Sequence, residues 1–334
     1  MKRQLVHTYN EIISLENLGA AWQEFVVGKK RKPDVLLFGR HLIDNILALH
    51  DELVKGTYRH GGYYSFYVTD PKRRHIHKAS VRDRLLHHAV HRMLYPFFDR
   101  TFIADSFSCR QKKGVHRAIN RFKALSFQVS KNHTRTAWVL KCDIRKFFAS
   151  IDQKILLHIL NQSIPDQKII NLLHIILSSF QTEGTPGVGL PLGNLTSQLL
   201  ANIYMNEFDQ WVKHQLKPPA YVRYADDFVF LSTDKQWLEI LIPRLENWLA
   251  EKLHLTLHPH KVFLKTLASG VDFLGWVHFP RHRVMRTRTK KRMLARIKFS
   301  PTKETLQSYL GLLSHGNTRT LQKQIIGDHW LWRP

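Results

Sequence analysis

The sequence is poor in cysteine and in long apolar runs. Its 334 residues include two cysteines, Cys109 and Cys142, which are too few for a disulfide framework or a cysteine-based zinc site. We interpret both as reduced, partly buried packing residues, which fits a cytoplasmic protein. The apolar runs are too short to span a bilayer, and no apolar core follows the charged residues at the N-terminus, so neither a membrane anchor nor a signal peptide is expected.

Negative charge is also scarce. The chain has 26 acidic and 51 basic residues, which gives a formal net charge of +25. Such a surplus opposes compaction by self-repulsion unless a polyanion is close. Nucleic acid is the polyanion we favour, because each neutralised phosphate releases a counterion and because the basic residues spread along the whole chain. A membrane surface, or solubility alone, is the alternative explanation.

Hydrophobic residues make up 43% of the chain, enough for a folded globular protein, and their spacing predicts both helices and strands. We expect helices at 35–55 (ending before Gly56), 82–98 (helical up to Pro96), 194–214 and 237–253, and two short helices within 152–180 broken near Pro165. We expect a hairpin within 57–80 with a basic rim at 71–74, a strand at 137–144, a second hairpin at 221–232, and strands around 262–266 and 271–278. Residues 182–193, rich in glycine and proline, are a predicted loop.

The order of elements in residues 137–266 is typical of a ferredoxin-like split βαβ unit. In that arrangement the first strand and the later hairpin can be neighbours, which would bring Asp143 beside Asp226 and Asp227. Three such carboxylates repel one another, and a hard divalent cation such as Mg²⁺ relieves the repulsion. Two such ions can activate a 3′-hydroxyl and stabilise the departing pyrophosphate. An Asp-Asp pair in a turn is weak support by itself, since Asp commonly caps turns.

Four motifs in order strengthen this hypothesis. Residues 224–227 (Tyr-Ala-Asp-Asp) resemble the YxDD box of reverse transcriptases, and residues 143–152 resemble their first catalytic motif. Residues 189–198 resemble the loop-to-helix motif between them, and residues 271–276 resemble the primer grip. The resemblance implies an α+β right-hand polymerase with a split βαβ palm. We assign 1–136 to an N-terminal segment and fingers, 137–279 to the palm with a fingers-type helical insertion at about 153–185, and 280–334 to a small basic helical thumb.

The resemblance also implies roles for single residues at the catalytic centre. Asp143, Asp226, Asp227 and the backbone carbonyl of Ile144 would hold two Mg²⁺ ions, with Mn²⁺ as a possible substitute. Phe148 would exclude a 2′-hydroxyl and so select deoxynucleotides; otherwise it is a core aromatic. Lys72 and Arg74 would hold the incoming triphosphate, and Lys261 would protonate pyrophosphate; otherwise these three are solvated cations.

Further residues are expected to contact nucleotide or nucleic acid. Gly193 would let the backbone approach the template or nucleotide closely, next to the helix start at Asn194. Arg110 and Gly114 lie in a segment typical of bacterial reverse transcriptases, where we expect template contact. The basic run after residue 280 is predicted to grip a duplex backbone, although it could be a solvated helix face; it comprises Arg281, Arg283, Arg286, Arg288, Lys290, Lys291 and Arg292.

The middle motif indicates a subfamily. Group II intron and retron enzymes usually have Gln-Gly followed by Ser-Pro, whereas this chain has Leu192-Gly193 and Ser197-Gln198. This pattern resembles the reverse transcriptases of diversity-generating retroelements, which are bacterial, archaeal or phage-encoded. That family copies a template-repeat RNA into cDNA with errors opposite adenine, using dNTPs and a small basic oligomeric accessory protein. Leu192 and Gln198 would then face the nascent base pair; otherwise Leu192 packs within the loop and Gln198 is a polar residue on a helix face.

Two other functions remain open. One is another bacterial reverse transcriptase, such as a retron, group II intron-like or phage-defence enzyme. The other is an RNA-binding splicing helper without polymerase activity, which would have a similar basic surface. Two histidine groups, His87, His88 and His91 on one predicted helix and a later group at 254–260, are interpreted as solvated or phosphate-facing rather than as zinc ligands, since no cysteine or carboxylate lies at ligand spacing.

Overall fold

The computed structural model describes residues 3–69, 72–300 and 302–331, with backbone only for 328–331. Asp70 and Pro71, in the expected hairpin tip, and the last residues of the expected thumb lie outside these ranges. The chain divides into two compact units. The first unit comprises residues 1–104, 144–216 and 245–257, and the second comprises residues 105–143, 217–244 and 258–334.

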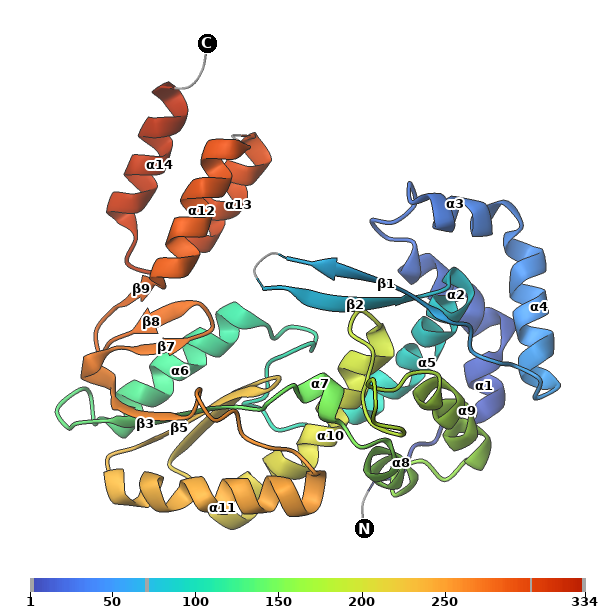
Figure 1. Cartoon of the computed structure of the whole chain (residues 1–334), viewed down its shortest axis with the longest axis horizontal. Helices are drawn as coiled ribbons and strands as arrows, with labels where there is room; N and C mark the ends of the chain where they lie inside the picture. The colour runs from blue at the N-terminus through green and yellow to red at the C-terminus, as the bar shows by residue number, and fades with distance from the viewer. Residues whose placement is uncertain (1–2, 70–71, 301, 332–334) are drawn as a thin grey trace. The chain divides into compact units, whose positions relative to one another are not determined.

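The first unit is largely helical and carries one hairpin (Figure 1). Its first half contains α1 (Tyr9–Ile13), α2 (Leu15–Phe25), α3 (Pro33–Arg40), α4 (Leu42–Val54), the antiparallel strands β1 (Tyr63–Val68) and β2 (Arg74–Ala79), and α5 (Val81–Asp99). Its second half contains α7 (Phe147–Ser150), α8 (Gln153–Asn161), α9 (Gln167–Ser178), α10 (Leu195–Trp211) and the π-helical turn Val212–Leu216. Helix α11 (Lys235–Leu253) begins in the second unit and ends in the first.

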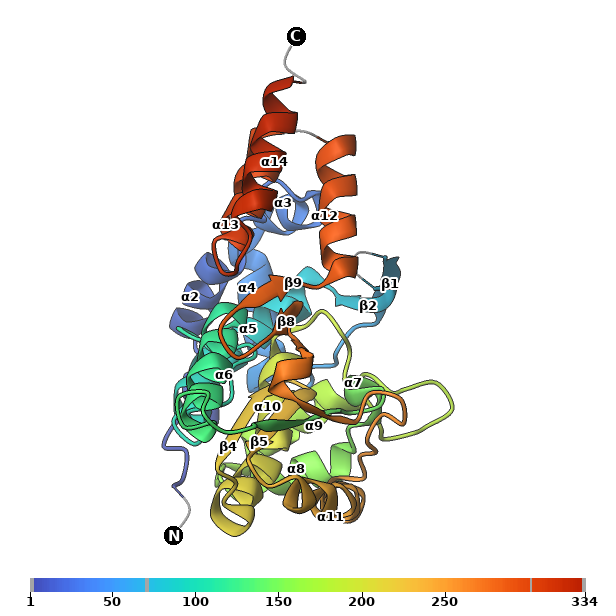
Figure 2. The same ribbon diagram turned by 90° about the vertical axis from the view of Figure 1, so that its left-hand side faces the viewer.

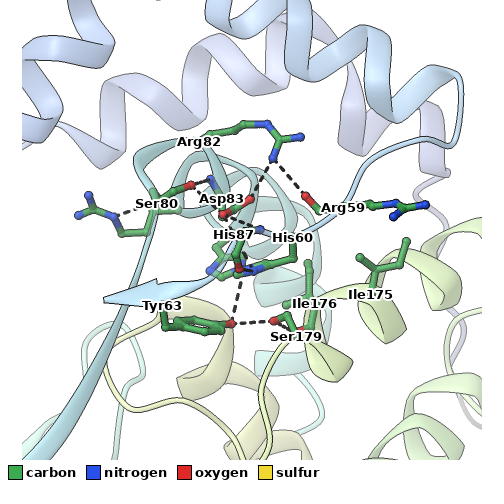
Figure 3. Close-up of polar contacts among 12 residues, drawn as sticks. Arg59, His60, Tyr63, Ser80, Arg82, Asp83, His87, Ile175, Ile176 and Ser179 are labelled. Atoms are coloured by element: carbon green, nitrogen blue, oxygen red, sulfur yellow. Dashed lines mark hydrogen bonds and ion pairs between the residues drawn. The ribbon is translucent and has the colours of Figure 1, made fainter. Parts of the chain in front are cut away.

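A buried polar network holds the root of this hairpin (Figure 3). Asp83 of α5 has no exposed surface and accepts hydrogen bonds from the Tyr58 hydroxyl at 2.8 Å, the Gly61 amide at 3.1 Å and the Ser80 hydroxyl at 2.7 Å. The ring of His60 stacks on His87, with 3.2 Å between their Nε2 atoms. The start of β1, helix α5 and the end of α9 thereby share one network, because Tyr63 bonds Ser179 at 2.8 Å.

The second unit contains the split βαβ sheet. Strands β3 (Trp138–Asp143), β4 (Ala220–Tyr224), β5 (Asp227–Ser232) and β6 (Phe263–Thr266) form an antiparallel sheet in the order β4-β5-β3-β6. With the strands numbered along the chain, this is the ferredoxin-like order 2-3-1-4, in which the hairpin β4–β5 lies beside the first strand. The expected neighbourhood of first strand and hairpin is therefore confirmed.

Alternate residues of these strands bury both faces of the sheet, as period-2 side-chain alternation requires. One face packs against α6 (Val115–Val129), which contributes Ala118, Phe122 and Leu125 to a core with Val139, Val222, Val229 and Leu231. The intervening residues Leu140, Cys142, Phe228 and Phe230 have no exposed surface either. A sheet buried on both faces keeps its strands in a fixed register, which matters for the acids at its end.

The C-terminal part of this unit adds a small sheet and three helices. Strands β7 (Val271–Phe273), β8 (Trp276–His278) and β9 (Arg283–Met285) form an antiparallel sheet after the 3₁₀ turn Leu267–Ser269. Helices α12 (Thr287–Phe299), α13 (Lys303–Leu313) and α14 (Arg319–Leu331) lie side by side (Figures 1 and 2). They share one core with Ile119, Trp276 and Met285, so the helical thumb is fastened to this small sheet.

Several boundaries differ from the sequence-based expectation. The helix expected at 35–55 is two helices separated at His41, and Leu36, Ile43 and Leu47 are exposed. Helix α5 passes through Pro96 to Asp99, because a proline in the last turn removes a single hydrogen bond. The single strand expected at 271–278 is the hairpin β7–β8, whose turn residues Leu274 and Gly275 have positive φ. The segment after 280 contains strand β9 and is not wholly helical.

Two expectations about single side chains are also wrong. Cys109 is exposed, whereas Cys142 is buried. The helix with three histidines does not turn them towards solvent: His87 is buried, and His88 and His91 are half-buried. Burial lowers the pKa of His87 to about 3 and that of His91 to about 4, so both rings are neutral. Within the described ranges, no helix combines the length and apolarity that crossing a membrane requires.

Candidate active site

Three carboxylates meet at one end of the split βαβ sheet. Asp143, the last residue of β3, lies directly opposite Asp227, the first residue of β5. Tyr224 pairs with Asp227, so Ala225 and Asp226 form a two-residue turn between β4 and β5. Ala225 has φ of 57°, a left-handed conformation that costs an L-residue free energy and that is often kept at functional sites. Like charges directly opposite in a sheet are destabilising, so this end of the sheet requires compensation.

Two lysines supply part of that compensation. The Lys141 ammonium lies 3.2 Å from Oδ2 of Asp227, and the Lys261 ammonium lies 2.8 Å from Oδ1 of Asp143. Lys141 is buried, whereas Lys261 is exposed enough to leave the carboxylate at little cost. Lys141 lies two residues before Asp143 and on the same face of the strand Trp138–Asp143, which is otherwise apolar. A lone lysine in such a strand could have indicated a partner for the acids, but it was not recognised from the sequence.

The compensation of Asp227 is incomplete. Its Oδ1 is buried and has no hydrogen-bond partner among the described residues. Burial raises the pKa of Asp227 to about 7; Lys141 opposes the rise, and the charges of Asp143 and Asp226 add to it. A hard divalent cation fits this donor set, because it would take an oxygen that no protein group uses and would neutralise the neighbouring charges. Among the described residues, no group of three or more Asp, Glu, His or Cys side chains is already arranged to hold an ion.

A buried arginine fixes the turn that carries Asp226. Arg223 has no exposed surface, and its Nη1 donates to the carbonyl of Ala225 at 3.0 Å while Nη2 donates to the Ser106 hydroxyl at 3.1 Å. Its backbone also pairs with residues on both sides of Ser106, at Asp105 and Phe107. Arg223 cannot be singled out from the sequence, because one charged residue in an apolar strand gives no information about its partners. Arg223 thus holds the turn that carries Asp226 in place.

The residues expected to bind the nucleotide lie in the first unit. Phe148 is half-buried, with its ring edge-on to Phe147 at 5.5 Å. The carbonyl of Leu192 accepts a hydrogen bond from the His77 amide at 2.9 Å, so the loop 189–194 is tied to strand β2. Gly193 has φ of 114°, and a Cβ there would lie 2.9 Å from Ile76, so the close backbone approach that the structure shows is to the hairpin. Lys72, Arg74 and Gln198 are exposed.

The remaining predicted residues separate into paired and exposed groups. Nη1 of Arg110 donates to the Ser106 carbonyl at 3.0 Å. Arg286 is paired with Asp272, and Arg283 is held by Asn120 and by the His315 carbonyl. Ile144 is buried, and its backbone bridges to Leu257 within the first unit. Arg292 is half-buried, and the exposed cations of this set are Arg281, Arg288, Lys290 and Lys291.

A split βαβ sheet with three acids at one end, preceded by a basic hairpin and followed by a helical thumb, defines a right-hand nucleic-acid polymerase. Residues 69–278 match the family "Reverse transcriptase (RNA-dependent DNA polymerase)". Because the match covers more than half of the 334 residues, the chain belongs to the reverse transcriptase family of RNA-directed DNA polymerases.

Individual relatives agree with this family. Protein YkfC of Escherichia coli K12 is 27% identical in an alignment 283 residues long, which covers 72% of this chain and 71% of YkfC. Group II intron-encoded protein LtrA of Lactococcus lactis is 24% identical over 305 residues, 70% of this chain but only 49% of LtrA. This chain therefore spans about half the length of LtrA. The apo telomerase of Candida tropicalis, truncated from its C-terminal domain, has a similar fold, with a TM-score of 0.50 at 13% identity over 74% of this chain and 60% of that one.

Proposed function

We propose that this chain extends a DNA strand on an RNA template with two divalent ions, Mg²⁺ or Mn²⁺, held by Asp143, Asp226, Asp227 and the carbonyl of Ile144. The observation that carries the proposal is the pairing of Asp143 opposite Asp227, with the buried Oδ1 of Asp227 left without a partner. When bound, the ions supply activation of the primer 3′-hydroxyl and neutralisation of the departing pyrophosphate. Reverse transcriptase domains generally use such ions, and the donor set here suits them.

The chain's own side chains have three further roles in this proposal. Lys261 would exchange its contact with Asp143 for one with pyrophosphate, to which it would donate a proton; the 2.8 Å contact supports its place at the site. Lys72 and Arg74, exposed on the hairpin, hold the triphosphate, and Phe148 excludes a 2′-hydroxyl. The basic residues that contact the nucleic-acid backbone are Arg110, Arg281, Arg283, Arg286, Arg288, Lys290, Lys291 and Arg292. Asn120 and Asp272 hold Arg283 and Arg286 in place.

Primer extension by Asp226→Asn tests the catalytic assignment. We expect loss of cDNA synthesis by about 10³-fold or more, because one oxygen ligand is removed from the ion site, while RNA binding stays near wild type. Asp44→Asn, an exposed acid of α4, is the matched control and should keep full activity. Near-normal synthesis by Asp226→Asn would show that the acids do not hold the ions.

We further infer that the enzyme belongs to a diversity-generating retroelement, copies a template-repeat RNA with errors opposite adenine, and works with a small basic oligomeric accessory protein. The support is the sequence Leu192-Gly193 with Ser197-Gln198 at the middle motif. Leu192 cannot make the hydrogen bonds that a glutamine could make near the nascent pair, so discrimination by geometry weakens. The half-buried position of Leu192 leaves room for this role.

Misincorporation by Leu192→Gln tests this inference separately. We expect fewer errors opposite adenine, with the total extension rate changed only a few-fold, because the loop stays tied to β2 through the Leu192 backbone. Gln198→Ala is the companion variant on the same motif, and it shows whether the helix face contributes. An unchanged error spectrum in Leu192→Gln would count against the retroelement assignment and would leave polymerase activity itself unaffected.

A group II intron-like enzyme is the second candidate, and the similarity to LtrA and YkfC favours it. A template repeat, a variable repeat and an accessory gene beside this gene would decide for the retroelement, whereas intron RNA flanking it would decide for the alternative. A non-catalytic RNA-binding helper is distinguished by the primer-extension assay, in which it would make no cDNA with Mg²⁺.

A further inference from the structure

A second site in the same unit has the opposite charge character. A cavity of about 180 Å³ lies where α6, the turn between β8 and β9, and the turn between α13 and α14 meet. Lys123, His278, His282, Arg283 and His315 line it, and no Asp or Glu is among the described residues that do. Phe122 and Phe279 form apolar parts of its wall. This cavity therefore concentrates basic groups and has no acid in its described lining.

The Arg283 side chain is held by hydrogen bonds, but one of its donor atoms has no partner among the described residues. Its Nε donates to the His315 carbonyl, its Nη2 donates to Asn120 at 2.8 Å, and its guanidinium lies over the Trp276 ring at 5.8 Å. Its Nη1 is buried and has no hydrogen-bond partner among the described residues. A guanidinium carries five N–H donors, and an unmatched buried donor costs free energy. A preorganised arginine with a spare donor is the group that proteins use to bind phosphate oxygens.

The positive charge of Arg283 acts on two neighbouring histidines. His116 stacks on His315 with 3.6 Å between ring centroids. Burial lowers the pKa of His116, and His315 and Arg283 lower it further. Burial lowers the pKa of His278 to about 4; Arg283 adds to this, whereas a hydrogen bond to the Phe273 carbonyl and the charge of Asp272 oppose it. An anion in the cavity would reverse the contribution of Arg283 and stabilise the protonated rings.

The size of the cavity limits what it can hold. Pockets that enclose a whole small molecule have volumes of roughly 300–1,000 Å³, well above the 180 Å³ found here. We therefore expect the cavity to take a phosphate with part of a sugar, with the base at its mouth. There His282 and Phe279 stack with 4.8 Å between their centroids and offer a flat aromatic surface. Lys123, exposed on α6, completes the rim with a cation for which no ion pair is described.

We propose that this cavity binds the phosphate group of a nucleotide unit, with Arg283 and Lys123 contacting the phosphate oxygens and the Phe279–His282 pair contacting the base. The phosphate comes either from an RNA backbone or from a free mononucleotide. The site does not depend on the polymerase assignment, because it lies outside the acid cluster and its assay contains no primer, dNTP or metal ion. It gives the basic protein a specific hold on a nucleotide in addition to the general attraction of its +25 charge.

The test uses the full chain in EDTA and three probes: inorganic phosphate, AMP and a short single-stranded RNA. Lys123→Gln removes a lining cation that has no described structural contact of its side chain, and Arg283→Gln removes the central donor. Arg117→Gln is the matched control, since it removes one exposed cation from the same helix without touching the cavity. Calorimetry measures each affinity, and thermal unfolding checks that each variant folds; if Arg283→Gln does not, Lys123→Gln still decides.

We expect each lining variant to bind AMP and phosphate roughly tenfold more weakly, as loss of one charge-assisted contact predicts, with little change for Arg117→Gln. If RNA is the occupant, Lys123→Gln also lowers the slope of log K against log salt by about 0.7. If a free nucleotide is the occupant, AMP binding weakens while that slope stays at the Arg117→Gln value. Equal affinities in both lining variants and in Arg117→Gln for all three probes would overturn the proposal, because the basic groups would then be ordinary surface charge.

Discussion

Asp83 and Asp227 both lie among packed side chains, but the hydrogen bonding of their carboxylates differs. Asp83 accepts hydrogen bonds from a tyrosine hydroxyl, a serine hydroxyl and a backbone amide, all of its own unit. Asp227 lies opposite Asp143 and keeps one oxygen without a partner among the described residues. A satisfied acid holds a chain segment in place, whereas an unsatisfied acid beside a like charge lowers stability unless something else binds. Asp83 therefore stabilises the fold, whereas Asp227 indicates a ligand site.

The same distinction applies to the cations. Arg223 is matched by the Ala225 carbonyl and the Ser106 hydroxyl, so its role is structural. Arg283 keeps a buried Nη1 without a described partner and lines a cavity without acids. The acid cluster and the basic cavity thus call for ligands of opposite charge within one unit.

The largest effect is expected from Asp227→Asn. Primer extension should fall by about 10³-fold or more, because a ligand of the proposed ion site is lost. Wild-type protein should gain thermal stability as Mg²⁺ is added, since an ion that binds only the folded state stabilises it by mass action, and the variant should lose most of this gain. Differential scanning calorimetry with and without MgCl₂ measures it. An undiminished Mg²⁺ response in Asp227→Asn would remove the distinction between the two acids.

The matched substitution Asp83→Asn should give the converse result. Replacing the carboxylate puts an amide group next to donors that it cannot all satisfy, which we expect to cost about 2–3 kcal/mol of unfolding free energy and several degrees of Tm. The increase of Tm with Mg²⁺ should equal that of wild type, because the ion site is unchanged. Tm values within error of wild type would mean that the network at the hairpin root carries no stability.

A smaller effect concerns pH and the histidine beside Asp83. The folded pKa of His87 is about 3, below the usual value of 6.5, so between these values the unfolded chain binds the proton first. The contribution of the neutral His87 ring to the free energy of unfolding is therefore fully present above pH 6.5. It decreases as the pH falls towards 3, by about 2 kcal/mol at pH 5. His87→Gln should flatten this part of the stability profile in urea titrations. A profile as steep as wild type would show that the ring is not buried neutral.

Much of the second unit could be predicted from its sequence. The short apolar runs around 139–142 and 228–231 indicated the strands, and the resemblance of their acidic ends to a known motif placed Asp143 beside the turn. The breaks at His41 and at Leu274-Gly275 could not be predicted, because apolar spacing continues through both. Pro96 was a misleading stop signal, since a proline near a helix end loses little.

The site was predicted less completely than the sheet. The acids carry a motif, but Lys141 and Arg223 act through partners that are distant in sequence, and only the register and the fold bring them into contact. The Arg283 cavity likewise combines residues from 122 to 317 without a local pattern. The histidines of α5 were predicted to face solvent, but their burial could not be inferred from residue type, because the helix is enclosed on several sides.

The bond from the His77 amide to the Leu192 carbonyl, and the contact of Gly193 with Ile76, join the loop before α10 to the strand that carries Arg74. The proposed contacts of the hairpin with the triphosphate and of the loop with the base pair would therefore be coupled through the backbone. We expect a bulkier residue at position 193 to displace Ile76 or the loop, because a Cβ there would lie 2.9 Å from that side chain. Substrate affinity and copying accuracy would then change together.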